Sequence, residues 1–185
     1  MEATTTRGAA PRVELRPAAP EDYEFLLEVY ASTRADELAQ VPWDDATKRA
    51  FCRQQYDAQK ADYDARFPAA RYDVILLDGR PAGRIWVERD DGEIRLLDIA
   101  LLPWAQRRGV GSSLVGELIE EARASGRRLR HMVFMYNEGA RRLYERLGFV
   151  VFEEQGAYLH MEWRGGAGEG DSGTDDEGAE TKAVG

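Results

Sequence analysis

The sequence has little cysteine and no long apolar run. Cys52 is the only cysteine among 185 residues, so an internal disulfide and a cysteine-built zinc site are both excluded. No apolar stretch approaches the ~18–20 residues that a membrane-spanning helix needs, and residues 1–11 lack the apolar segment of a signal peptide. These absences predict a cytoplasmic protein without a membrane segment and without a metal site.

Basic residues are outnumbered by acidic ones. The sequence has 25 Lys and Arg against 34 Asp and Glu, which gives a net charge of −9. Nucleic-acid binding through a broad basic surface is therefore excluded, since phosphate neutralisation needs clustered basic residues. Residues 165–185 are rich in glycine and acidic residues and contain no aromatic residue. Such a segment buries too little apolar surface to offset its ordering entropy. We expect disorder over 1–11 and 165–185, and one domain over 12–164.

The first part of this domain predicts a strand followed by two helices. Residues 12–16 alternate as a half-buried strand does, and Pro20 then opens a helix whose apolar residues recur at helical spacing. A second helix begins near Asp44 or Asp45, either of which can cap it, and runs towards Phe67. This segment therefore supplies two helices before the main strands begin.

The rest of the domain predicts further strands interrupted by two helices. Three strand-like runs joined by tight turns form an antiparallel meander. A helix between the last of these and the next strand implies a parallel crossover, so we expect an α/β fold with a mixed sheet and helices on its faces. The expected strands are 72–77, 83–88, 94–102, 129–134, 149–153 and 158–163, and the helices lie over 114–122 and 140–147.

The most informative segment is Gln106-Arg107-Arg108-Gly109-Val110-Gly111, between an expected strand and an expected helix. Glycines let the backbone turn tightly and approach a ligand closely, and a helix start offers unpaired N–H groups to a pyrophosphate. A Walker A loop would need a lysine where Ser112 stands, and a dinucleotide fingerprint would need a glycine at Leu114. On these residues alone, an ordinary glycine-containing turn explains the pattern equally well.

A second motif, over residues 137–149, decides between these interpretations. It reads NEGARRLYERLGF and is similar to the N-x-x-A-x-x-LYE-x-x-GF helix of the GCN5-related N-acetyltransferases. Residues 99–103 lead into the glycine segment, which is similar to the Q/R-x-x-G-x-G/A motif of that family. The resemblance extends over nearly all of residues 12–164. It implies the acyl-CoA N-acyltransferase fold, a mostly antiparallel sheet with one parallel, splayed pair of strands and flanking helices.

The resemblance implies acetyl-CoA as the acetyl donor and an amine as the acceptor. Backbone N–H groups over 108–114 would hold the pyrophosphate, and residues 101–103 would line the pantetheine arm. The Leu101 amide would donate to the thioester carbonyl, where negative charge develops, and Asn137 would place the cofactor near Tyr144. The implied cofactor-binding residues are Leu101, Leu102, Pro103, Gln106, Arg107, Arg108, Gly109, Val110, Gly111, Ser112, Ser113, Leu114 and Asn137.

Tyr144 is, by the same resemblance, the proton donor to the departing thiolate. A thiol pKa near ~8.5 and a phenol pKa near ~10 make this transfer slightly uphill, so Tyr144 would act mostly as a hydrogen-bond donor to sulfur. By spacing alone, Tyr144 belongs to an apolar helical stripe. Glu93 and Asp98 are the candidate general bases, although each is more often a solvated or structural carboxylate, and a water relay would need no single base. Met132 stands where members that acetylate protein N-termini tend to carry Glu, which counts against that specificity.

We expect direct transfer, in a ternary complex, to the primary amine of a small molecule, because the motifs contain no cysteine that could carry an acetyl group. Residues 33–37 and 43–45 offer carboxylates and an aromatic ring to a cationic amine, although helix capping and solvated surfaces explain the same residues. A protein or peptide amine is the alternative acceptor. A non-catalytic acyl-CoA-binding module and an unrelated phosphate-binding domain are the alternative functions, and a homodimer stays open.

Overall fold

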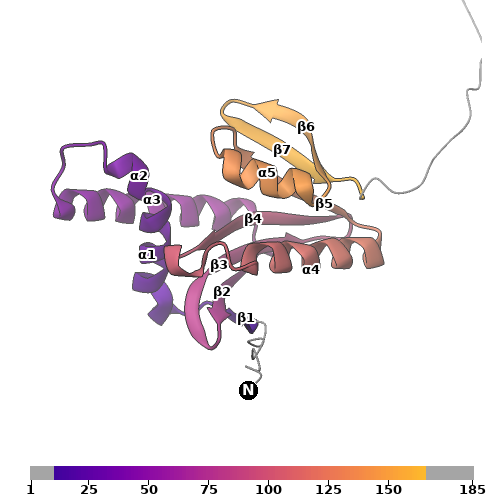
Figure 1. Cartoon of the computed structure of the whole chain (residues 1–185), viewed down its shortest axis with the longest axis horizontal. Coiled ribbons are helices and arrows are strands. Elements are labelled where there is room, and N and C mark those ends of the chain that lie inside the picture. The colour runs from indigo at the N-terminus through magenta and orange to yellow at the C-terminus, as the bar shows by residue number, and fades with distance from the viewer. Residues whose placement is uncertain (1–10, 166–185) are drawn as a thin grey trace, which may run out of the picture.

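The computed structural model describes residues 11–165, and its central element is a seven-stranded sheet of order β1-β2-β3-β4-β5-β7-β6 (Figure 1). Only the β4–β5 pair is parallel. The predicted mixed α/β fold with a parallel crossover is confirmed. The strands are β1 (Val13–Pro17), β2 (Arg71–Leu77), β3 (Arg80–Arg89), β4 (Glu93–Leu101), β5 (Arg128–Phe134), β6 (Phe149–Gln155) and β7 (Tyr158–Trp163).

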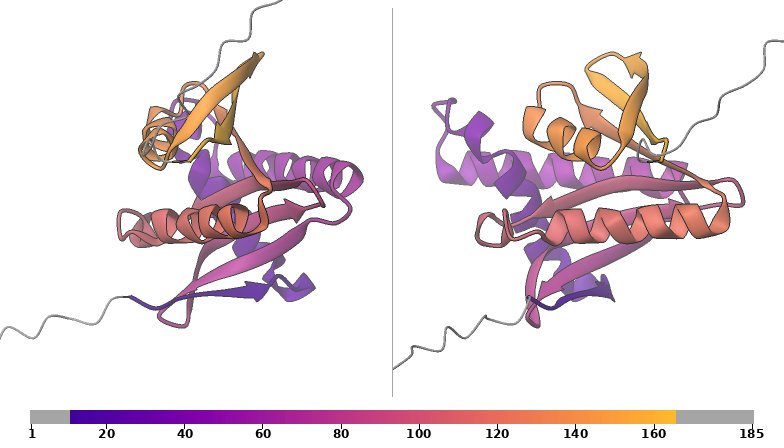
Figure 2. Two further views of the ribbon diagram at one scale, coloured as in Figure 1. Left: turned by 90° about the vertical axis from the view of Figure 1, so that its right-hand side faces the viewer. Right: turned by 45° about the vertical axis from the view of Figure 1, so that its right-hand side comes forward.

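Helices cover the sheet on both faces. Figure 2 shows α4 and α5 on one side of the sheet and α3 on the other. The short α2 has a single turn and was not predicted, because one turn gives no helical periodicity to read. The helices are α1 (Tyr23–Thr33), α2 (Ala35–Leu38), α3 (Asp45–Arg66), α4 (Val110–Ser125) and α5 (Glu138–Arg146), and 3-10 turns lie over Pro20–Asp22 and Pro103–Ala105.

Each face of the sheet has its own apolar core. The apolar stripe of α4 packs with Leu96, Leu129 and Tyr144 on one face. The stripe of α1 packs with Tyr56 of α3 and Trp86 of β3 on the other. The sheet is therefore sandwiched over β2–β4, where strand alternation lets each strand contribute side chains to both cores.

Residues at the ends of two helices show how the sequence sets their limits. The Asp44 side chain accepts a hydrogen bond of 2.8 Å from the Thr47 amide and caps α3, as a short acidic side chain before a helix does. Gly126 ends α4 in the left-handed region, with φ of 69°, which glycine adopts without steric cost. Of the two cap residues considered, Asp44 is the one that acts.

The terminal segments expected to be disordered lie outside the described residues, except for Pro11 and Gly165. Between those two residues, the structure contains no helix with the length and apolar character needed to cross a membrane.

Candidate active site

The parallel strands β4 and β5 pair over only part of their length. Their register begins with Glu93 opposite Arg128 and ends with Leu96 opposite His131. Beyond that point β4 continues to Leu101, paired only with β3, and β5 continues to Phe134, paired only with β7. The two strands therefore form a fork, and the inner edge of β4 from Leu97 to Leu101 has no partner strand among the described residues.

His131 lies at the closed end of this fork. Its Nδ1 is 2.8 Å from the carbonyl oxygen of Leu96, and its ring lies 4.4 Å from that of Tyr144, centroid to centroid. Because a carbonyl only accepts, Nδ1 carries the proton in the neutral ring. Burial lowers the pKa of His131 below its ordinary value, which favours this neutral form.

A β-bulge in β4 lies directly at the start of the fork. Trp86 of β3 is opposite Asp98, whereas Val87 is opposite Leu96, so Leu97 has no residue opposite it. A bulge changes the direction of the side chains that follow it. Leu97 packs in the core beneath α1 and α3, and Asp98 also faces that side, where it pairs with a buried arginine.

That arginine is Arg84 of β3, whose side chain is only 2% exposed. Its Nε donates to Asp98 Oδ2 at 2.6 Å, and Nη2 donates to Gln59 at 3.2 Å. The guanidinium lies 4.4 Å from the ring of Trp86 and also contacts Tyr30 and Tyr56. A charge this deeply buried needs a partner of opposite sign, so Arg84 fixes the position of the Asp98 carboxylate.

The backbone of β4 points hydrogen-bonding groups into the fork. Leu102 N donates to Ala82 O at 2.8 Å, towards β3, and successive backbone N–H groups point to opposite edges of a strand. The Leu101 N–H therefore points away from β3 and into the fork. Gly83, opposite Leu101, is required here, because a Cβ on Gly83 would lie 2.2 Å from Ala100 O.

The glycine segment forms the expected turn at the end of this strand. Gly109 is the N-cap of α4 with φ of 80°, and Arg107 is also in the left-handed region with φ of 57°. The first backbone bond of α4 runs from Ser113 N to Gly109 O. Among the described residues, no protein group accepts from the backbone N–H groups of 107–112, as expected at a helix N-terminus.

Side chains tie this turn to the strand. Gln106 Nε2 donates to Leu101 O at 2.8 Å, so the turn lies against the open end of the fork. Leu102 instead buries its side chain with Val29 and Ala100 beneath α1, and Pro103 begins a 3-10 turn. Of the three residues expected along the pantetheine arm, Leu101 is the one whose backbone faces the fork.

Helix α5 places Tyr144 beside the fork. Asn137 caps this helix by accepting from Ala140 N at 3.0 Å, and Tyr144 lies further along with only 2% of its surface exposed. Burial raises the pKa of Tyr144, and the negative charge of Asp98 adds to the effect. No hydrogen bond within residues 11–165 involves the Tyr144 hydroxyl. The ring is thus part of the core, and its hydroxyl is protonated.

On the opposite face, an open groove runs between α3 and the fork. This α3 groove has a volume of about 560 Å³ and is lined by residues of α1, α3, β3, β4, β5 and β7 and by Arg34 and Asn137. Asp98, Arg84 and Tyr63 are among its lining residues. Asp98 and Tyr144 therefore flank the fork from its two faces.

The structure brings some predicted residues to the groove and leaves others away from it. Thr33 and Arg34 line it, whereas the rest of 33–37 and all of 43–45 do not. Glu93 lies at the first paired position of β4 and β5, away from the fork, where it forms ion pairs with Arg95 and Arg130. Of the two candidate bases, only Asp98 lies in the fork.

Comparison with known proteins identifies the family. Residues 28–149 match the acetyltransferase (GNAT) family, and the chain belongs to it. Among curated relatives, the uncharacterized N-acetyltransferase CgeE of Bacillus subtilis is 28% identical over 78 residues, which are 42% of this chain and 30% of that protein. An uncharacterized N-acetyltransferase of Methanocaldococcus jannaschii is 33% identical over 98 residues, 48% of this chain and 42% of that one. The chain thus spans less than half the length of these relatives.

Solved structures show the same fold. The PaiA N-acetyltransferase of Thermoplasma acidophilum, in complex with coenzyme A, has a TM-score of 0.61 at 20% identity, with 82% of this chain and 98% of that chain covered. An acetyltransferase of Thermus thermophilus has a TM-score of 0.59 at 20% identity, with 83% and 96% covered. The fold predicted from the two motifs is therefore confirmed.

Sequence reasoning missed two features of this site. The bulge at Leu97 depends on the register between β3 and β4, which no local pattern encodes. Arg84 was assigned only to a strand, yet it is the one charged residue in the buried run 82–87. A charged residue surrounded by apolar strand residues was the available signal that a buried partner, here Asp98, had to exist.

Proposed function

We propose that the chain binds acetyl-CoA in the fork between β4 and β5 and transfers the acetyl group directly to the primary amine of a small molecule. The fork is the observation that supports this proposal. Its open end adjoins free backbone N–H groups at a helix N-terminus, the arrangement that binds pyrophosphate. Its unpaired strand edge suits an extended pantetheine arm, which can pair with a strand as a peptide does.

The Leu101 N–H is the donor for the thioester carbonyl. It points into the fork from a strand held by β3 on its other edge. A preorganised N–H aimed at the oxygen that gains negative charge lowers the barrier of acyl transfer. Gly83 supports this arrangement, since its missing side chain lets β3 approach the backbone of Ala100 closely.

Asp98 receives the amine from the α3 groove. Arg84 holds its Oδ2 at 2.6 Å, while no hydrogen bond among the described residues involves Oδ1. An ordinary carboxyl is a far weaker base than an ordinary amine, so Asp98 attracts the cationic amine, which loses one proton to solvent before its lone pair can attack. As the C–N bond forms, the nitrogen becomes more acidic, and Asp98 takes the second proton from it.

Tyr144 acts on the sulfur from the other face of the fork. As the C–S bond breaks, the Tyr144 hydroxyl donates a hydrogen bond or its proton to the leaving thiolate. The raised pKa of Tyr144 makes complete proton transfer more uphill than for an ordinary phenol. Hydrogen-bond donation is therefore its main contribution.

Direct transfer is favoured over an acetylated enzyme. Cys52 is buried on α3, and burial raises the pKa of its thiol, which disfavours the nucleophilic thiolate. A small acceptor is favoured by the size of the α3 groove, because about 560 Å³ is typical of small-molecule pockets.

Calorimetry with acetyl-CoA, followed by thiol release on a panel of small amines and peptides, tests the proposal. We expect acetyl-CoA binding and turnover with small primary amines. Binding without turnover on any amine would indicate a non-catalytic acyl-CoA-binding module. Faster turnover with peptides than with small amines would indicate a protein or peptide acceptor. Nucleotide binding in place of CoA binding would overturn the assignment.

The variant Ser112→Asp locates the donor site. An added carboxylate at the N-terminus of α4 favours the helix dipole, so the fold should keep its stability. It would repel a pyrophosphate, so acetyl-CoA affinity should fall at least tenfold. Unchanged affinity in a folded Ser112→Asp protein would place the diphosphate elsewhere.

A further inference from the structure

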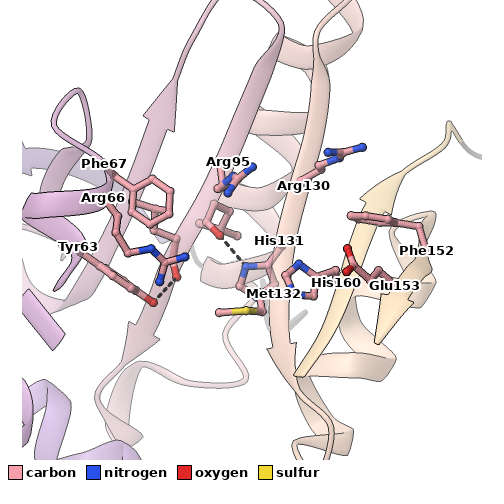
Figure 3. A pocket seen from close by; sticks show the side chains of 12 residues that line it. Tyr63, Arg66, Phe67, Arg95, Arg130, His131, Met132, Phe152, Glu153 and His160 are labelled. Carbon is pink, nitrogen blue, oxygen red and sulfur yellow. Dashed lines mark hydrogen bonds between the residues drawn. The ribbon is translucent and has the colours of Figure 1, made fainter. Parts of the chain in front are cut away.

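A second cavity, shown in Figure 3, shares part of its lining with the α3 groove. This arginine pocket has a volume of about 240 Å³ and lies between the end of α3, strands β4 and β5, and the β6–β7 hairpin. Tyr63, Arg66 and Met132 line both cavities. A ligand held in the groove can therefore extend into the pocket without leaving the protein surface.

Guanidinium groups dominate the charge of the arginine pocket. Arg66, Arg95 and Arg130 line it, against a single carboxylate, Glu153 (Figure 3). Arg95 lies 5.6 Å from the ring of Phe67, and Arg130 lies 4.6 Å from that of Phe152. Aromatic faces help to hold these two guanidinium groups in place, while their N–H groups pair with Glu93 and Glu162.

The carboxylates behind the pocket do not cancel this charge. Glu93 forms ion pairs with Arg95, Arg128 and Arg130. Glu162 pairs with Arg130 and Arg164. Two carboxylates are thus shared among four arginines, of which Arg95 and Arg130 line the pocket. Arg128 and Arg164 are more exposed, so the excess positive charge of this cluster extends from the pocket to the adjoining surface.

Arg66 is the cation best placed to bind a ligand. Its one ion pair within residues 11–165, with Asp62 at 3.1 Å, joins side chains that are 58% and 53% exposed, and such exposed pairs contribute little to stability. Arg66 can therefore exchange this partner for a ligand. His160 adds a polar group to the pocket, because its Nε2 is buried and has no hydrogen-bond partner among the described residues.

We propose that the arginine pocket binds an anionic group of the acceptor, so that the substrate is an amine that also carries a carboxylate or a phosphate. This inference rests on the proposed function. The amine lies at Asp98 in the α3 groove, and the anionic end lies beside Arg66 in the arginine pocket. Arginine binds both anions through paired N–H groups, so the shared chemistry is a planar or tetrahedral oxyanion. The pocket's small volume suits the end of a ligand.

Matched acceptors separate the anion from the amine. A series of ω-amino carboxylates, ω-aminoalkyl phosphates and ω-amino alcohols of equal chain length keeps the amine constant and changes only the far end. We expect kcat/KM for the best anionic acceptor to exceed that for its alcohol by at least tenfold. The carboxylate and phosphate arms show which anion is preferred.

Two arginines of the same helix provide the matched variants. Arg66→Ala should raise KM for the anionic acceptor about tenfold, with the alcohol unaffected. Arg53→Ala removes an equal charge from α3, where Arg53 pairs with exposed Glu24 outside both cavities, and should leave the preference unchanged. Arg66→Lys should restore part of it.

The outcomes distinguish this inference from the proposed function. Turnover with alcohols as good as with their anionic partners, or equal effects of Arg66→Ala and Arg53→Ala, would overturn the anion site while leaving the enzyme intact. Absence of thiol release with every acceptor, despite a folded protein, would overturn the proposed function itself.

Discussion

His131 lies against Tyr144, with ring centroids 4.4 Å apart, while its Nδ1 hydrogen-bonds the carbonyl oxygen of Leu96 at 2.8 Å. Leu96 and His131 form the last paired register of β4 and β5. One imidazole therefore contacts both the point where the strands separate and the tyrosine beside the opening. The geometry of the fork and the position of Tyr144 are linked through this ring.

This relationship predicts a pH-dependent stability. Burial lowers the pKa of His131, so on acidification the unfolded chain takes up this proton before the folded one does. The free energy of unfolding should therefore fall as pH drops below about 6.5, by up to ~1.4 kcal/mol per pH unit, and should owe nothing to His131 above that pH. Denaturant unfolding between pH 5 and pH 8 measures the slope.

The second histidine supplies the control, since the chain has only two. His131→Gln should remove the slope between pH 6.5 and pH 5, whatever its effect on stability at neutral pH. His160→Gln should retain it. The same slope in both variants would show that other groups cause the acid sensitivity.

The sequence predicted the order of the elements well because each depends on local information. Periodicity located the stripes of α4 and α5, although the two helices begin at Val110 and Glu138, before the expected 114 and 140. The features that build the site depend instead on contacts between distant segments. The pairing of β4 with β5 stops at His131, and the bulge in β4 brings Asp98 into contact with Arg84 of β3. Both features depend on how two strands are aligned, which the sequence of one strand alone does not determine.

The candidate bases show the same distinction. Glu93 and Asp98 look alike in sequence, as acidic residues at or within one strand. Their separation along β4 puts Glu93 among arginines at the first paired position of β4 and β5, and puts Asp98 in the fork. Only the topology of the sheet, which determines where β5 leaves β4, distinguishes their roles.

Tyr144→Phe tests the proton donor. Removal of the hydroxyl should lower kcat on the order of 10², the lower range for general acid catalysis, with little change in acetyl-CoA affinity. Stability should not fall, because no hydrogen bond of the described residues involves this hydroxyl. Steady-state kinetics with saturating acetyl-CoA, together with thermal unfolding, gives both readouts. Unchanged turnover would remove Tyr144 from the mechanism.

Two glycine substitutions test the backbone contact that supports the fork. A Cβ at Gly83 would lie 2.2 Å from Ala100 O and 2.9 Å from a Leu101 methyl group, so β3 and β4 must separate locally. Gly83→Ala should destabilise the protein by ~1–3 kcal/mol, the usual cost of overpacking, and weaken acetyl-CoA binding. Chemical denaturation and calorimetry measure the two effects.

Gly116→Ala is the matched substitution. Gly116 lies within α4, and a Cβ there would meet no heavy atom within 4 Å apart from its chain neighbours and the nearby backbone of its own helix. Alanine in a helix interior is ~0.5–1 kcal/mol more favourable than glycine, so this variant should gain stability and keep its affinity. A loss in both variants would mean that the effect at Gly83 is not specific to the strand contact.

Asp98→Asn tests the carboxylate that faces the amine. Asparagine keeps the shape but removes the charge, so kcat/KM for the amine should fall ~10²-fold while acetyl-CoA affinity is retained. Stability should also fall, because Arg84, 2% exposed, loses the counter-charge bonded to its Nε, and an unpaired buried charge is strongly destabilising. Asp62→Asn is the control, since Asp62 also lines the α3 groove but is about half exposed. If Asp98 acts at the amine itself, only Asp98→Asn lowers kcat; equal losses in both variants would mean that the groove attracts the amine through its overall charge alone.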